Sequence, residues 1–300
     1  MSDVTPPGSP AAVPLPTLAE LRQRIDAIDT QLIDLLVARA EVVETVGAVK
    51  RAAGEDVGIF LRPGREMDIL RRLLKQAKDG RFRKSVIVRI WRELFAAMVA
   101  VEGPLTAAVY MPSRGAGFLE LARDSYGAYT PMVAVPSPGS VVKAVANAEV
   151  TVGILPMPHL GDTERWWPAL ASAAPGTPSV VGRVPFAGPG PGRGDGIEGL
   201  VICRLPQEDT GHDRTYIVIE ADEDLSRTGL RSLAENAGLV VAEMPDTDDT
   251  SPVARLHLLE IETCVLPTDQ RLVELGRESA IRRVSVIGGY AIPFTADDLA

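Results

Sequence analysis

Two positive side chains interrupt an apolar helical pattern near the N-terminus. Between residues 18 and 51, apolar residues recur every three or four positions, which is the spacing of one face of an α-helix. Arg39 follows Leu35 by 4 residues and Leu32 by 7, so it lies within the apolar stripe. Lys50 follows Arg39 by 11 residues, which is about 20° more than three full turns and returns it to the same face. Burying two cations in an apolar core costs folding free energy unless an anion pairs with them.

Two further charges belong to this pattern. Arg22 precedes Arg39 by 17 residues, which places it about 100° around the helix and roughly 25 Å along it. On one straight helix Arg22 cannot share a small site with Arg39, but it can reach a site in a second subunit. Glu102 lies on the apolar face of a later helix, with Phe95 and Met98.

Two hypotheses follow from this spacing. In the first, Arg39 and Lys50 bind an anionic substrate. In the second, they pair with Glu66 or Glu102 in buried structural salt bridges, and the segment is a helical dimerisation module without catalytic activity.

Three predicted helices carry these residues. Thr17 is the expected N-cap of the first, with Glu20 completing a capping box, and the pattern continues for about 34 residues, roughly 50 Å. The second helix begins at Pro63, which suits a first turn, and stops near Gly80; the third runs from about Phe82 to Gly103. An apolar stripe as long as the first needs cover from another chain. The segment therefore predicts an intertwined helical dimer.

Three stretches of this block carry a family resemblance. They are LRQRIDAIDTQLIDLLVARAEVVETVGAVK, RPGREMDIL and WRELFAAMVAVEGPL. Together they resemble the all-helical AroQ class of chorismate mutases, and in particular the mutase half of the bifunctional chorismate mutase–prephenate dehydratases, over nearly all of residues 18–105. The resemblance implies an interlocked dimer with two identical sites, each taking one arginine from the partner's long helix.

The resemblance also implies roles for individual residues. Arg22 would come from the partner, Arg39 would bind one carboxylate of chorismate, and Lys50 and Glu102 would meet its ether oxygen. Glu66 would accept the substrate hydroxyl. Three further positions complete the implied binding set: Arg65 beside Glu66, Arg62 where a branch of the family has an acidic residue, and Met98 where it has a serine.

The implied chemistry agrees with the residue types. Rearranging chorismate to prephenate is a unimolecular shift that needs a compact dicarboxylate held in place and donors aimed at the ether oxygen. Such a site requires no cofactor and no metal, and residues 18–103 contain no histidine or cysteine. We expect chorismate as the small-molecule partner and catalysis without a cofactor.

Composition narrows the remaining function classes. The 300 residues have a formal net charge of −9, which argues against nucleic-acid binding. Two cysteines and three histidines are too few for a disulfide scaffold or a structural zinc site. The sequence has no apolar run of membrane-spanning length and no signal-peptide pattern. We therefore expect a cytoplasmic protein without membrane contact.

Residues after Gly103 follow a different pattern, with short β-rich runs and helical stretches near 115–126 and 139–147. The runs are TAAVYM, PMVAVP, VTVGILP, SVVGRV, GLVIC, TYIVIE and VSVIGGY, and their alternation with helices predicts an α/β lobe. The stretches AAVYMPSRGAGFLELARDSYG and VVKAVANAEVTVGILPMP resemble the opening lobe of prephenate dehydratase. That family's Thr-Arg-Phe signature has its only counterpart in Arg214-Thr215-Tyr216, with the order changed. A degenerate lobe and an active bifunctional enzyme are the two alternatives.

Residues 213–294 are predicted to follow a βαββαβ order, which resembles an ACT domain. An amino-acid effector would then be a candidate partner, although Asp224-Leu225-Ser226-Arg227 and Glu243-Met244-Pro245-Asp246 replace the motifs of phenylalanine-binding members. A purely structural, dimerising role is the alternative. The expected organisation is a tail (1–17), a mutase domain (18–105), a dehydratase-like lobe with a Gly/Pro linker (106–197) and an ACT-like α+β domain (198–300).

Overall fold

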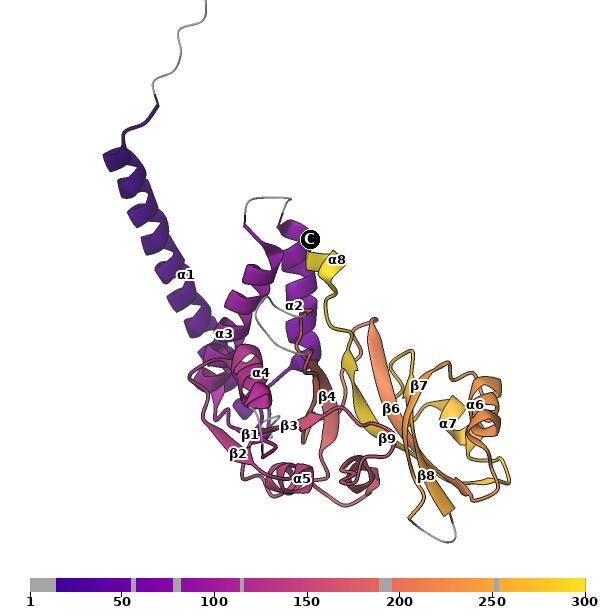
Figure 1. Ribbon diagram of the computed structural model, residues 1–300. Helices are drawn as coiled ribbons and strands as arrows, with labels where there is room; N and C mark the ends of the chain where they lie inside the picture. Colours follow the sequence, from indigo (N-terminus) through magenta and orange to yellow (C-terminus); the bar gives the residue numbers. More distant parts are fainter. Residues whose placement is uncertain are drawn as a thin grey trace, which may run out of the picture. The chain divides into compact units, whose positions relative to one another are not determined.

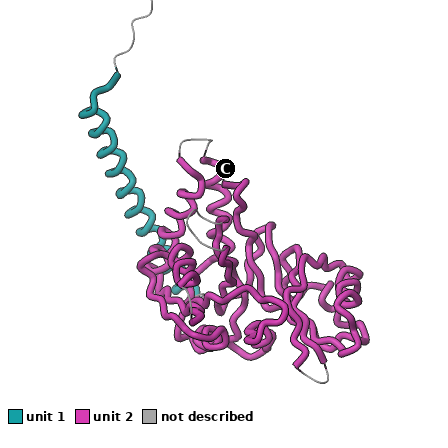
Figure 2. The backbone as a smooth tube through the Cα atoms, in the orientation of Figure 1, with its two compact units in different colours: residues 1–55 teal, residues 56–300 magenta. Residues whose placement is uncertain are grey.

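The computed structural model describes six stretches of the chain, with gaps between them: 15–54, 58–77, 82–113, 116–188, 196–250 and 254–299. The chain divides into two compact units, residues 1–55 and residues 56–300 (Figure 2). The predicted tail up to residue 14 and most of the Gly/Pro linker, 189–195, lie outside the described residues.

The first unit contains one long helix, α1 (Leu18–Ala52). Thr17 caps it as predicted: its hydroxyl accepts the Glu20 backbone N–H, and the Glu20 carboxylate accepts the Thr17 backbone N–H at 2.7 Å. Within α1 only Gly47 is buried. Large apolar side chains along the helix are exposed, including Ile28 at 54%, Leu32 at 53% and Leu35 at 67%. The apolar stripe predicted for this helix is therefore exposed to solvent in the folded chain.

The second unit begins with two helices, α2 (Pro63–Gln76) and α3 (Lys84–Glu102). Pro63 occupies the first turn of α2, where its missing N–H costs nothing. α2 ends at Gln76, and the predicted stop near Gly80 lies outside the described residues. The helices pack through buried side chains that include Met67 and Leu70 of α2 and Phe95 and Val99 of α3.

A nine-stranded sheet forms the centre of the second unit (Figure 1). Its strands are β1 (Ala107–Tyr110), β2 (Met132–Val135), β3 (Val152–Pro156), β4 (Ser179–Val184), β5 (Gly199–Cys203), β6 (Asp213–Asp222), β7 (Val241–Asp248), β8 (Ala254–Ile261) and β9 (Ile281–Ala291). The spatial order is β2-β1-β3-β5-β4-β9-β6-β8-β7. Each of the seven predicted β-rich runs coincides with an observed strand or lies within one.

Helices cover both faces of this sheet because its strands alternate their side chains between two cores. Ala107 and Val109 of β1 face the core shared with α2, α3 and α4 (Gly117–Tyr126), whereas Ala108 faces α5 (Pro138–Ala146) and the 3₁₀ helix Trp167–Ala171. A third core packs α6 (Arg227–Asn236) and α7 (Gln270–Leu275) against β6 and β8. The chain ends in a short helix, α8 (Ala296–Leu299).

A single glycine lies where the two halves of the sheet meet. β4 and β9 are paired at Val180 and Gly288, where Gly288 has φ +100°. A Cβ at Gly288 would overlap the Val180 carbonyl oxygen, so only glycine allows the strands to approach. The strands predicted for the lobe and for the βαββαβ segment therefore form one continuous sheet. No helix within the described stretches is both long and apolar enough to cross a membrane.

A buried histidine on β8 predicts a pH effect on stability. His257 is 1% exposed, and burial together with Arg227 and Arg255 lowers its pKa from 6.5 to about 4. Between pH 6.5 and pH 4 the imidazole is protonated in the unfolded chain but neutral in the folded one. The contribution of His257 to the free energy of unfolding is therefore present above pH 6.5 and is lost as the pH falls. We expect the protonation of His257 to lower the free energy of unfolding by about 2 kcal/mol when the pH falls from 7 to 5.

Urea unfolding at the two pH values measures this loss. His257→Asn keeps a polar group toward Thr247, whose hydroxyl lies 3.1 Å from the His257 Nδ1 atom, but does not titrate. The variant should show a pH dependence smaller by about 2 kcal/mol. An equal dependence in both proteins would contradict the assignment.

Candidate functional site

The first unit holds three of the predicted site residues, all on α1. Arg22 lies near its N-terminus and is exposed, whereas Arg39 and Lys50 are half-buried. Because α1 is continuous from Leu18 to Ala52, Arg39 and Lys50 lie on one face about 16 Å apart along the helix. The predicted geometry of these two cations on one helix is confirmed.

The other five predicted residues belong to the second unit. Arg62 precedes α2 as its N-cap residue, and Arg65 and Glu66 lie in its first turn. Met98 and Glu102 lie in the last turns of α3 and are half-buried. The structure thus brings three of the predicted residues together at the beginning of α2.

Glu66 forms a buried ion pair with a residue that the spacing did not single out. Arg92 of α3 donates from Nη1 to Glu66 Oε2 at 2.5 Å, and the two side chains are 4% and 8% exposed. Arg92 Nε also donates to the Ser125 carbonyl oxygen at 2.7 Å, and its guanidinium lies 4.0 Å from the Phe186 ring centroid. Burial raises the pKa of the Glu66 carboxyl, and Arg92 opposes that shift. The predicted partners of Glu66 are a substrate hydroxyl or the cations Arg39 and Lys50, whereas in the structure its Oε2 atom accepts from Arg92.

A second carboxylate meets the beginning of α2 from far along the chain. Glu208 Oε2 accepts the backbone N–H groups of Gly64 at 2.9 Å and Arg65 at 3.3 Å. Its Oε1 atom forms an ion pair with Arg62 Nε. The Arg62 side chain makes no capping hydrogen bond to its own helix, so Glu208 satisfies amide groups that a helix leaves unpaired at its N-terminus and places a negative charge there. The sequence analysis did not identify Glu208.

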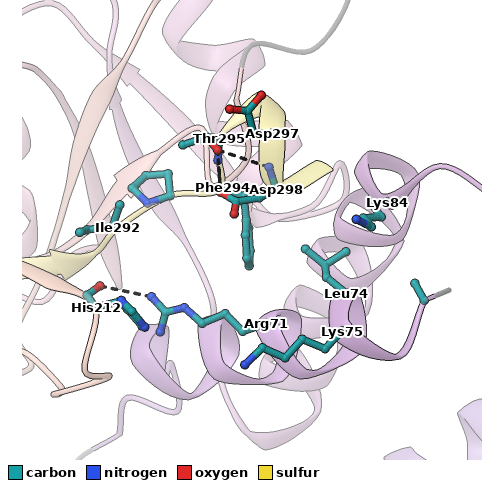
Figure 3. A pocket seen from close by; sticks show the side chains of 12 residues that line it. Arg71, Leu74, Lys75, Lys84, His212, Ile292, Phe294, Thr295, Asp297 and Asp298 are labelled. Atoms are coloured by element: carbon teal, nitrogen blue, oxygen red, sulfur yellow. Dashed lines mark hydrogen bonds between the residues drawn. The ribbon is translucent and has the colours of Figure 1, made fainter. Parts of the chain in front are cut away.

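A pocket of about 740 Å³ lies beside the C-terminal half of α2 (Figure 3). Its lining carries charges of both signs, and Leu74 and Phe294 form an apolar wall; the charged residues are Arg71, Lys75, Lys84, Asp297 and Asp298. Arg71 donates to the Thr210 and His212 carbonyl oxygens at 3.5 and 3.2 Å. None of the eight predicted site residues lines this pocket.

The counterpart of the dehydratase signature lies on β6 and is bound within the protein. The Thr215 hydroxyl contacts Gln207 Oε1 at 2.9 Å and the Thr263 carbonyl oxygen at 2.9 Å. Arg214 Nη1 lies 2.9 Å from Glu262 Oε1, and Tyr216 is 1% exposed. Thr215 and Arg214 are thus bound to other residues of this chain, and Tyr216 is buried in its core.

The segments that replace the phenylalanine motifs also bind one another. Arg227 donates to the Thr247 hydroxyl at 2.7 Å and to the Met244 carbonyl oxygen at 2.5 Å. Asp246 is fully buried and accepts hydrogen bonds from Arg165 Nε at 2.9 Å and Trp167 Nε1 at 3.0 Å. These contacts attach β7 to α6 and to the 3₁₀-helix segment.

Comparisons with known proteins agree with the helical part of this description. Residues 21–103 match the family model "Chorismate mutase type II". The bifunctional chorismate mutase/prephenate dehydratase of Pseudomonas aeruginosa is 32% identical over 145 residues, which are 47% of this chain and 38% of that protein. The intracellular chorismate mutase of Mycobacterium tuberculosis is 32% identical over 79 residues, which are 26% of this chain and 72% of that protein.

Among solved structures, prephenate dehydratase from Arthrobacter aurescens in complex with L-Phe matches 62% of this chain and 90% of its own, with 13% identity and a TM-score of 0.46. The chain spans less than half the length of the bifunctional relatives it matches. Most of the smaller mutase is covered, at 32% identity, and the family model spans α2, α3 and nearly all of α1. The chain belongs to the type II chorismate mutase family.

Proposed function

We propose that this protein is a chorismate mutase that rearranges chorismate to prephenate without a cofactor, in the biosynthesis of phenylalanine and tyrosine. The observation that carries the proposal is the family match over residues 21–103, because this range contains all eight predicted site residues. The Pseudomonas aeruginosa and Mycobacterium tuberculosis relatives carry the same activity in their names.

The proposed mechanism uses only positioning and electrostatics. Arg39, and Arg22 of a second copy, bind the two carboxylates of chorismate and hold its compact reactive conformer. Lys50 stabilises the negative charge that develops on the ether oxygen as its bond to the ring breaks. Glu102 donates a hydrogen bond to the same oxygen, which a glutamate does only in its protonated form.

The remaining residues orient the ring. Arg92 holds Glu66 Oε2, and we assign Glu66 Oε1 to the substrate hydroxyl. Arg65 and Arg62 add positive charge at the beginning of α2, and Met98 contributes apolar contact from α3. No electron or proton has to leave the substrate in this rearrangement, so these side chains act by placement alone.

We further propose that the active assembly is a homodimer built on α1. The exposed apolar side chains along this helix form a surface that a second copy can cover, and a helix of 35 residues offers a seam of about 50 Å. The angular offset between Arg22 and Arg39 supports a site that takes its Arg22 from the partner.

Mixing two inactive variants tests both proposals at once. Arg22→Ala and Arg39→Ala should each be nearly inactive, but a mixed dimer contains one site in which both arginines are present. After an equal mixture is unfolded and refolded, half of the dimers are mixed, and we expect about a quarter of the wild-type activity to return. Activity no higher than that of the separate variants would contradict the shared site.

A bifunctional mutase–dehydratase is the second candidate. The similarity to the Pseudomonas aeruginosa protein extends over 145 residues, more than the stretch that the mutase family model matches. Thr215 and Arg214 have structural partners, however, which favours a lobe without dehydratase activity. Phenylpyruvate formed from added prephenate would identify the bifunctional enzyme. An ACT-like sensor for an amino acid in residues 213–294 is compatible with either activity.

A further inference from the structure

The contacts around α2 extend the proposed function to the C-terminal part of the chain. We propose that the described residues between 104 and 299 position the first turn of α2 for the mutase reaction, directly through Glu208 and indirectly through Arg92 of α3, which they hold in place. The inference rests on the proposed function, because the first turn of α2 holds Arg65 and Glu66.

The first contact is the carboxylate of Glu208. It accepts two backbone N–H groups of α2, from Gly64 and Arg65, and pairs with Arg62. A Cβ at Gly64 would lie 2.7 Å from the Glu208 Cβ atom, so the close approach depends on glycine at this position. One side chain thus fixes both the entry into α2 and the direction of its first turn.

The segment that carries Glu208 is itself firmly attached to the sheet. We call residues 205–212 the strap; it connects β5 to β6. Gln207 Nε2 donates to the Arg214 carbonyl oxygen at 3.0 Å, and the Thr210 backbone N–H and hydroxyl donate to Asp213 at 2.8 and 2.9 Å. Because the strap is held to β6, Glu208 is a fixed group and not a mobile surface carboxylate.

The strap also contacts α2 about two turns further on. Arg71 donates to the carbonyl oxygens of Thr210 and His212, and Figure 3 shows its guanidinium reaching from α2 toward His212. Two points on one helix, at Gly64 and at Arg71, are therefore joined to the same strap. Contacts at two points fix the rotation of α2 about its own axis as well as its distance from the strap.

The second contact is the buried guanidinium of Arg92. It binds Glu66 with Nη1 and the Ser125 carbonyl oxygen of α4 with Nε, and it lies 4.0 Å from the Phe186 ring centroid and 5.4 Å from the Tyr126 ring centroid. Ser125, Tyr126 and Phe186 all belong to the C-terminal part. The direction of the Glu66 carboxylate is consequently set by residues outside the helices that the mutase family model matches.

These contacts explain what the C-terminal part does for the proposed reaction. A displacement of about 1 Å in a positioning group can cost roughly 100-fold in rate. Arg65 and Glu66 lie directly on the turn that Glu208 and Arg92 hold. The α/β part then serves the mutase as a scaffold, whether or not it has an activity of its own.

Steady-state kinetics of Glu208 variants in the full chain test the inference. For Glu208→Ala we expect KM for chorismate to rise about 10-fold, because the arginines and Glu66 of α2 lose their fixed direction. Glu208→Gln keeps an acceptor for the Gly64 N–H but loses the charge that pairs with Arg62. Its KM should therefore lie between that of the wild type and that of Glu208→Ala. A substitution that only lowers stability reduces the amount of active enzyme and leaves KM unchanged.

Glu198→Ala is the matched control. Glu198 also forms an ion pair in the C-terminal part, with Arg183 Nη2 at 2.8 Å, but it does not contact α2, and KM should stay within twofold of wild type. Amide hydrogen exchange supplies a readout independent of activity: Glu208→Ala should speed exchange at Gly64 and Arg65, and Glu198→Ala should not.

An unchanged KM in Glu208→Ala, or unchanged exchange at these two amides, would overturn the positioning role. A wild-type chain that leaves chorismate unconsumed would overturn the proposed function and, with it, the inference. The two failures are distinguishable because only the second is visible in the wild-type protein.

Discussion

Replacing Arg39 by alanine is expected to lower kcat/KM for chorismate by about 1,000-fold. Arg39 is half-buried within the apolar stripe of α1, and its planar guanidinium suits bidentate binding of a carboxylate. Without it, the substrate loses the charge-assisted hydrogen bonds that keep its reacting carbons together. Both kcat and KM should change, because the interaction orients the bound substrate as well as holding it.

Arg24→Ala is the matched control for this prediction. Arg24 lies on the same helix, two residues after Arg22, and is exposed. Its removal should change kcat/KM by less than threefold, and circular dichroism should show equal helix content in the two variants. Comparable losses in Arg24→Ala and Arg39→Ala would mean that the charge of α1, and not the Arg39 site, explains the effect.

Replacing Arg92 by methionine is expected to destabilise the second unit by about 3–5 kcal/mol. The Glu66 carboxylate is 8% exposed and would remain buried without the cation that now binds its Oε2 atom. Methionine is unbranched and keeps the apolar contacts of the arginine stem, so the loss of charge and hydrogen bonds dominates. Urea unfolding at pH 7 measures the change.

The double variant Glu66→Gln/Arg92→Met distinguishes the contribution of the ion pair to stability from that of the other contacts of Arg92. Once the carboxylate is neutral, the loss of Arg92 leaves no buried charge, and we expect the double variant to be more stable than Arg92→Met by about 1–3 kcal/mol. Equal stability of the single and double variants would show that Arg92 stabilises the fold through Ser125 and the aromatic rings and not through Glu66.

Local patterns predicted most of the elements. The capping box of Thr17 and Glu20 and the first-turn Pro63 mark helix beginnings because the responsible contacts are within a few residues. The β-rich runs from residue 106 onward all coincide with strands or lie within them, because the pattern that predicts a strand is contained in about five or six neighbouring residues. The positions of Arg39 and Lys50 on one face likewise follow from helix geometry alone.

The contacts that fix α2 could not be predicted in this way. Arg62 and Glu208 are 146 residues apart, and Glu66 and Arg92 are 26 residues apart on different helices. Arg92 lies within the apolar pattern of α3, 4 residues after Val88 and 3 before Phe95, but its spacing does not show which residue it binds. Glu208 stands in a polar connection between strands. These charges find their partners only in the folded chain, which brings the strap to α2 and α4 to α3.

We propose above all that this chain rearranges chorismate by itself, with no added cofactor. The most direct measurement follows chorismate and prephenate together by proton NMR, with the purified full chain treated with a chelator and dialysed. We predict that chorismate disappears and prephenate appears mole for mole, far faster than in buffer. Chorismate that decays at the rate measured in buffer alone would contradict the claim.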